Sequence, residues 1–180
     1  MIVSTLIGNI APQEKRVATV LHGETFYSFD TELKGVHIPM LVSEYTWDDK
    51  FVGKVKITGY LTRIQKNNGR ALYLRAVDLA PAEEDATLTN EFVLTGRIKR
   101  KRPYEITKNG VEIMQMVILL SLPNSQHNVG VTVVTKDSAA RYYRNVEEGS
   151  SIDNVYGYLK QRGRTYEIVV KRPLTVTKEE

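Results

Sequence analysis

Basic side chains gather in one stretch of this 180-residue chain, from Arg97 to Tyr104, which reads RIKRKRPY. Arginine and lysine neutralise phosphates, and exposed aromatic rings stack on bases at roughly 1–3 kcal/mol per base. On an alternating strand, Arg97 and Lys99 share the face opposite Ile98 and can line one surface together with Lys101. The stretch therefore predicts contact with a flexible polyanion. The competing interpretation is a solvated strand edge, where lysines only discourage pairing with another strand.

Two tyrosines occupy the same place in a tripeptide, Gly-Tyr-Leu, that occurs at residues 59–61 and again at 157–159. Period-two alternation points Tyr60 and Tyr158 outward, between an inward glycine and an inward leucine. Lys56 lies near the first tyrosine and Lys160 near the second, which gives each copy an aromatic ring beside a cation. We predict that both rings stack on bases. Cross-strand packing is the alternative, because tyrosine favours strands in any case.

A basic turn follows each tripeptide. Arginine pairs with phosphates or lies flat on bases, whereas an ordinary polar hairpin turn explains the glycines in these turns but not the arginines. Together with the residues above, the turns complete the predicted nucleic-acid-binding set. Its members are Lys56, Tyr60, Arg63, Lys66, Arg70, Tyr73, Arg97, Lys99, Lys101, Arg102, Tyr104, Tyr158, Lys160, Arg162 and Arg164.

The elements that must position these side chains come in two similar sets. The motif LIGNI at residues 6–10 recurs as LTGRI at 94–98, and internal repeats govern the choice of architecture. Residues 136–145 predict a short helix. Alternation with Gly or Asn punctuation predicts five strands in each half. The ranges are 1–11, 24–34, 36–44, 54–64 and 70–80, then 90–101, 110–121, 127–135, 151–162 and 164–177.

These elements predict a mainly β protein with two domains. Domain 1 covers residues 1–80, a linker rich in Pro, Ala and acidic residues covers 81–89, and domain 2 covers 90–180. Three strands, a short helix and two strands is the order of a five-stranded OB barrel. We predict two tandem OB-fold barrels, with the helix between strands three and four of the second. An immunoglobulin-like sandwich would need about seven strands per domain.

Composition limits the classes of function. The net charge of +4 comes from residues 85–180, with 15 basic against 11 acidic side chains, so polyanion binding should depend more on the second half. Cysteine is absent, the three histidines are isolated, and no phosphate-cradling or nucleophile motif occurs. We therefore predict no metal, no cofactor and no enzymatic activity. No segment approaches the ~20 apolar residues of a membrane span, and we expect a cytoplasmic protein.

Three further features have open interpretations. Phe26 stands alone on a polar strand face, where it can meet a base or be buried at a contact. Trp47 is expected to close a barrel end. The run from Met114 to Leu120 is apolar on both faces, which indicates core on one side and an interface on the other.

Four segments of the second half occur in an order typical of one known family. They are VTVVTK at 131–136, AARYY at 139–143, EGSS at 148–151 and GYLKQR at 157–162. Shorter counterparts in the first half are GETFYSF at 23–29, IPMLVSE at 38–44 and VGKVKITG at 52–59. This order resembles that of bacterial single-stranded DNA-binding proteins. The whole chain resembles the tandem two-OB-domain type of Gram-positive bacteria and their mobile elements.

The resemblance implies a non-catalytic protein that binds and protects single-stranded DNA in replication, recombination or repair. DNA and RNA both stay open as ligands. It also implies a nucleoid-associated location and a homodimer with four OB domains. Residues 175–180 lack the acidic tip with which such proteins recruit replication proteins, so that route of recruitment is not expected. The alternative is an OB interaction scaffold in replication restart or conjugation that resembles primosomal protein N.

Overall fold

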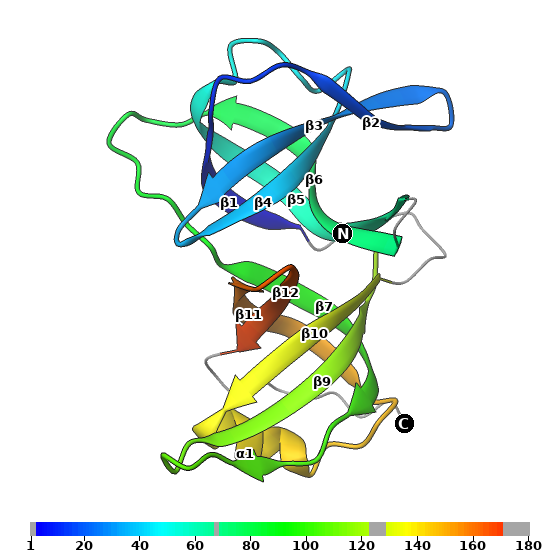
Figure 1. The fold of residues 1–180 in the computed structure, drawn as a ribbon, viewed down its shortest axis with the longest axis vertical. Helices are drawn as coiled ribbons and strands as arrows, with labels where there is room; N and C mark the ends of the chain where they lie inside the picture. Colours follow the sequence, from blue (N-terminus) through cyan, green and yellow to red (C-terminus); the bar gives the residue numbers. More distant parts are fainter. Residues whose placement is uncertain (1–2, 67–68, 123–128, 171–180) are drawn as a thin grey trace. The chain divides into compact units, whose positions relative to one another are not determined.

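The computed structural model describes residues 3–66, 69–122 and 129–170, and it gives only the backbone of Lys66. The chain divides into two compact units, Val3–Asn90 and the part that begins at Glu91. Each unit is built around one six-stranded sheet (Figure 1). We refer to them as the N-terminal and C-terminal units.

In the N-terminal unit, five strands close into a ring in the order β1, β5, β6, β4, β3, because the end of β1 pairs with β3. The parallel pair β4–β6 completes the closure. Five strands closed in this order form an OB barrel. The sixth strand, β2, pairs with β3 outside the ring. The strands are β1 (Ser4–Ile10), β2 (Arg16–Leu21), β3 (Glu24–Leu33), β4 (Val36–Ser43), β5 (Gly53–Lys66) and β6 (Gly69–Pro81).

The C-terminal unit repeats this topology. Its ring runs β7, β11, β12, β10, β9, with β10 and β12 parallel, and the two-residue strand β8 pairs with β9 outside the ring. A short helix of eight residues, α1, connects the third and fourth ring strands. The elements are β7 (Phe92–Lys101), β8 (Glu105–Ile106), β9 (Glu112–Leu120), β10 (Val129–Lys136), α1 (Asp137–Arg144), β11 (Ser151–Arg162) and β12 (Thr165–Val170). The predicted fold class, two tandem barrels with one short helix in the second, is confirmed.

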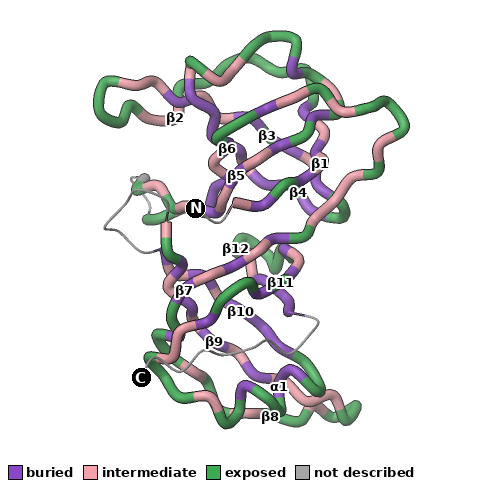
Figure 2. Tube along the Cα trace, turned by 180° about the vertical axis from the view of Figure 1, so that it is seen from behind, coloured by how far each residue is buried: buried purple, intermediate pink, exposed green. Residues whose placement is uncertain are grey.

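Alternation of side chains places the core inside each ring, and Figure 2 shows buried and exposed positions following one another along the strands. The repeated Gly-Tyr-Leu tripeptide lies at the same place in both rings. A Cβ on Gly157 would lie 2.5 Å from the Cγ2 atom of Ile168, and a Cβ on Gly59 would collide with the carbonyl oxygen of Arg75. Glycine is needed at both places because the neighbouring strand approaches too closely for a side chain.

The connection between the third and fourth ring strands differs between the units. In the N-terminal unit, the ring of Trp47, which was expected to close a barrel end, stacks on that of buried Phe29 at 3.8 Å. In the C-terminal unit, α1 takes this place and buries Ala139, Ala140 and Tyr143. Aromatic packing and a helix thus serve as alternative covers for the same part of the barrel.

Two parts of the chain differ from the expectation. The strand β2 was not predicted, because its residues show no inside–outside alternation and most of them are exposed. The segment 81–89, expected to be a linker, is fastened to the N-terminal unit. There Thr89 exchanges hydrogen bonds with Ile7, and the Asn90 side chain donates to the carbonyl oxygen of Lys34. The expected strand 164–177 is described as far as Val170, and residues 127–128 and 171–180 lie outside the described residues.

Candidate nucleic-acid interface

Tyr60 lies on the outer face of the N-terminal barrel, opposite Arg75 in the β5–β6 pair. Its ring is half-buried, and the guanidinium carbon of Arg75 lies 6.0 Å from its centre. The same guanidinium carbon lies 4.6 Å from the centre of the Phe26 ring on β3. Arg75 was missed in the sequence because it stands alone between apolar residues of β6. Only the strand pairing brings it to the predicted tyrosine.

Phe26 is buried within its own unit, in a small cluster on the outer face of the sheet. The cluster joins Phe26 to Leu41 of β4 and Tyr73 of β6, all of them fully buried. Partly buried residues of β2, β5 and β6 pack against it, namely Ala18, Ile64 and Ala71. The β2–β3 and β5–β6 hairpins therefore fold toward each other over β4 and cover these rings.

The prediction that Tyr73 stacks on a base is therefore wrong. Alternation places it on the outer face as predicted, but its side chain is only 1% exposed. A base cannot stack on a ring that is covered by neighbouring hairpins. Period-two alternation assigns a face, and it does not tell whether hairpins curl over that face.

The basic residues of the β5–β6 hairpin divide between its two faces. Arg63 and Arg70 are exposed, and the Nε–H of Arg70 donates to the side-chain oxygen of Gln65 at 3.3 Å. The register pairs Arg63 with Leu72 and Tyr60 with Arg75, so the alternation sets Arg63 and Tyr60 on opposite faces of the ribbon. Lys56 is exposed on the same face as Tyr60. The side chain of Lys66 lies outside the described residues.

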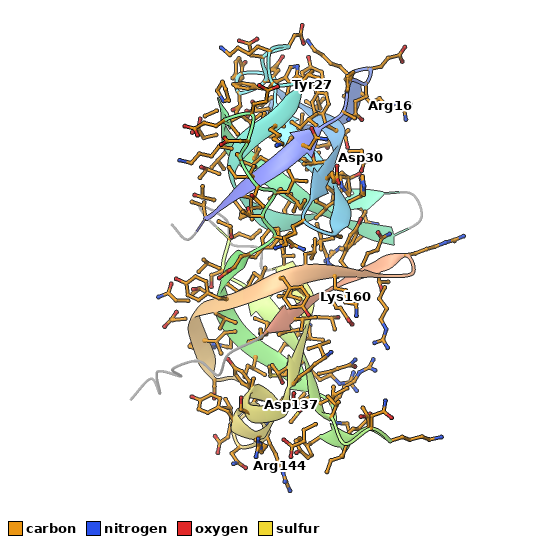
Figure 3. All side chains as sticks on the ribbon, turned by 90° about the vertical axis from the view of Figure 1, so that its left-hand side faces the viewer. Arg16, Tyr27, Asp30, Asp137, Arg144 and Lys160 are labelled. Carbon is orange, nitrogen blue, oxygen red and sulfur yellow. The ribbon has the colours of Figure 1, made fainter. Side chains whose placement is uncertain are left out.

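The C-terminal unit carries its candidate residues in one row on β11. Tyr158 is half-buried, and Lys160 and Arg162 are exposed on the same face of the strand. Figure 3 shows Lys160 on this long strand, in a different part of the unit from Arg144 on α1. Arg162 forms an ion pair of 3.5 Å with Glu167 of β12, but its side chain is 69% exposed. An exposed pair of this kind is weak, so Arg162 keeps most of its capacity to bind an anion.

A β-bulge rearranges the basic stretch of β7. Ile98 pairs with Ile118 and Arg100 with Val117, so Lys99 is an extra residue with no partner on β9. Alternation is broken at a bulge, and residues beyond it change face. The predicted shared face of Arg97, Lys99 and Lys101 is therefore wrong for Lys101. Arg100, which was not predicted, takes the outer position, while Arg97, Lys99, Arg102 and Arg164 are exposed.

Lys101 and Tyr104 serve instead to attach β7 to the helix. The Nζ group of Lys101 donates to the carbonyl oxygens of Arg144 and Val146, at 2.9 and 2.6 Å. The Arg144 guanidinium lies 5.0 Å from the centre of the Tyr104 ring. Desolvation and a hydrogen bond with Glu112 raise the pKa of the Tyr104 hydroxyl. A cation at the end of a helix also complements its dipole, so these contacts have a structural purpose.

A second group of cations is neutralised by neighbouring carboxylates. Lys15 pairs with Asp49 at 2.8 Å, Lys50 with Asp48 at 2.9 Å and Arg141 with Glu112 at 2.8 Å. Lys15 and the Nε1–H of Trp47 hold the pKa of Asp49 below its usual range. These paired cations, unlike those of β11, lie outside the predicted binding set.

Neither a metal site nor a membrane helix emerges from the described part of the chain. Within residues 3–66, 69–122 and 129–170, no group of three or more His, Asp or Glu side chains could hold a metal ion. The helix found in those residues is too short and too polar to cross a membrane.

The architecture defines a class of fold, the tandem pair of OB barrels, and solved structures share it. The chain is similar to the single-stranded DNA-binding protein from Thermus aquaticus, with a TM-score of 0.75 and 14% identity over 99% of this chain and 94% of that one. A deletion mutant of the same protein matches equally, over 95% of its length. The priB protein of Ralstonia solanacearum covers 46% of this chain at a TM-score of 0.42. Comparisons with protein-family models and with curated proteins gave no match.

Proposed function

We propose that this protein binds single-stranded DNA without catalysing a reaction on it. The observation that carries the proposal is the pair of equivalent tyrosines, Tyr60 and Tyr158, half-buried on the outer face of two OB barrels and each accompanied by cations. OB barrels bind oligonucleotides on the outer face of their strands and the adjoining loops. Half-exposed rings beside cations suit a strand whose bases are unstacked and whose phosphates need neutralising.

Titration of labelled oligo(dT) followed by fluorescence anisotropy tests the proposal. We expect binding that weakens steeply as salt rises, because phosphate contacts release counterions. A duplex of the same length should compete poorly, because its bases are stacked on one another and cannot stack on the tyrosine rings. Equal affinity for duplex and single strand, or no binding at low salt, would refute the proposal. A parallel titration with oligo(rU) decides between DNA and RNA.

The cellular role follows from the proposed ligand. A protein that coats single-stranded DNA protects it during replication, recombination or repair, and in bacteria it works in the cytoplasm at the nucleoid. Full-chain similarity to the Thermus aquaticus protein supports this role. Origin in a Gram-positive bacterium or its mobile elements is part of the same proposal.

We also propose a homodimer. The outer face of β9 presents the half-buried apolar side chains Ile113, Val117 and Leu119, which suit a contact between copies. Sedimentation equilibrium of the full chain should show a dimer, and a monomer at every concentration tested would contradict it.

A protein-interaction scaffold is the second candidate, favoured by one observation. The edge strand β2 leaves Val17 63% and Val20 58% exposed, and an exposed apolar edge can accept an added strand from a partner. If this were the main function, Val17→Lys would abolish partner binding, while oligo(dT) would bind neither form. Retained oligo(dT) binding by Val17→Lys would favour the first candidate.

A further inference from the structure

One outer-face contact of the N-terminal unit joins an arginine to two aromatic rings. The guanidinium of Arg75 contacts two rings, that of buried Phe26 at 4.6 Å and that of half-buried Tyr60 at 6.0 Å. Arginine over an aromatic face is held by the ring quadrupole and by its own planarity. The guanidinium thus links a ring fixed in the protein to a ring at the surface.

The strand register shows which residue replaces Arg75 in the C-terminal unit. Arg75 pairs with Tyr60 across β5–β6 and with Leu41 across β4–β6. Val169 pairs with Tyr158 across β11–β12 and with Val134 across β10–β12. The two positions are therefore equivalent, and an arginine in one repeat stands where the other has a valine.

The ring beneath Arg75 also differs between repeats. Phe26 pairs with Ser43 on the neighbouring strand, and the residue in this position of the second repeat is Ile113, opposite Lys136. An isoleucine offers no π face to a cation. The second repeat thus has Val169 and Ile113 where the first has Arg75 and Phe26.

The charge of Arg75 is not neutralised by the described residues. None of the carboxylates in residues 3–66, 69–122 and 129–170 lies within ion-pair distance of its guanidinium. A purely structural arginine of a half-buried site commonly has such a partner, because an unpaired charge is costly to desolvate. Here the positive charge lies beside the ring that we assign to base stacking.

We propose that Phe26, Arg75 and Tyr60 form a built base-stacking site, in which Phe26 supports Arg75 and Arg75 holds the Tyr60 ring for an unstacked base. This inference rests on the proposed function and deepens it, because it divides the work between the repeats. The N-terminal unit, whose basic and acidic residues balance over 1–84, takes bases. The C-terminal unit, with Val169 in this place and the excess of basic residues, makes most of the phosphate contacts in addition to stacking at Tyr158.

The test uses the full chain and photo-cross-linking to iodouracil-substituted oligo(dT), with the cross-link at Tyr158 as internal reference. Arg75→Val copies the residue of the second repeat, and we expect it to lower the yield at Tyr60 relative to Tyr158 by roughly fivefold or more. Arg75→Lys keeps the charge without the planar group and should keep the salt dependence of binding while losing most of the Tyr60 cross-link. Lys50→Val, which removes a cation already paired with Asp48, is the one-charge control.

The outcomes separate this inference from the proposed function. If the wild type binds oligo(dT) and folded Arg75→Val cross-links at Tyr60 as strongly as the wild type, the inference is overturned and the function stands. Full rescue by Arg75→Lys would also overturn it, because a point charge would then suffice. Circular dichroism and a urea unfolding curve establish whether each variant folds. If Arg75→Val does not fold, the result for the milder Arg75→Lys decides between the outcomes. Absence of wild-type binding would overturn the function itself.

Discussion

The salt dependence of binding should fall by a calculable amount when unpaired cations of the C-terminal unit are removed. Arg100 on β7, Lys160 on β11 and Arg164 in the β11–β12 turn are all exposed, and no carboxylate of the described residues pairs with them. The variant replaces all three with glutamine. If each cation neutralises one phosphate of a single strand, the slope of log affinity against log salt becomes shallower by about 2.

This change in slope has a direct consequence for affinity. Raising salt from about 50 mM to about 200 mM should narrow the affinity gap between wild type and variant by about 20-fold. Fluorescence anisotropy with labelled oligo(dT) over a series of salt concentrations measures both slopes. Glutamine keeps the length and polarity of the side chains, so stability should change little.

A matched control removes the same amount of charge from paired cations. Lys15, Lys50 and Arg141 each form an ion pair of 2.8 or 2.9 Å with an aspartate or glutamate. Replacement of these three by glutamine should leave the slope within experimental error of the wild type. If both triple variants lower the slope equally, binding follows overall charge, and the assignment of phosphate contacts to the outer face is wrong.

Three further predictions concern the scaffold that positions the interface. Lys101→Ala removes two hydrogen bonds to the carbonyl end of α1 and should lower the free energy of unfolding by about 1–2 kcal/mol, measured by urea titration. The affinity for oligo(dT) should stay close to wild type. A loss of affinity without loss of stability would show that Lys101 binds DNA. Gly157→Ala sets a Cβ against Ile168 and should destabilise the protein by about 1–3 kcal/mol, seen as a lower urea midpoint than for Gly130→Ala, where the added Cβ has room. The lowered pKa of Asp49 means that its carboxylate stabilises the fold at neutral pH, and that this contribution is lost as the pH falls through the folded-state pKa, which lies below the usual aspartate range. The fluorescence emission of Trp47, whose Nε1–H donates to Asp49, should shift over this pH range. Asp49→Asn should show no such transition.

The fold could be predicted because its signals are local. Glycine is needed where strands approach closely, and the Gly-Tyr-Leu tripeptide marks one such place in each barrel. Alternation then assigns the inner and outer face of each ring strand. Strand β2 escaped prediction for the same reason: it lies outside the ring, has no fully buried residue, and therefore carries no alternation.

The candidate site could be predicted only in part, because its remaining features depend on pairing between distant strands. The bulge at Lys99 turns Lys101 toward α1, and nothing in the local sequence of β7 specifies it. Tyr73 has the predicted face but is covered by curled hairpins. Arg75 reaches Phe26 and Tyr60 through the pairing of four strands, β3, β4, β6 and β5.

The most direct test of the account asks which rings meet the bases. Full-length protein is irradiated with iodouracil-substituted oligo(dT), and cross-linked peptides are identified by mass spectrometry. We predict cross-links at Tyr60 and Tyr158, with little at Tyr45. The Tyr45 side chain is 81% exposed and therefore serves as a measure of accessibility alone. Cross-links confined to Tyr45 and other exposed tyrosines such as Tyr156, with none at the two repeated positions, would contradict the claim that the outer faces of the barrels hold the strand.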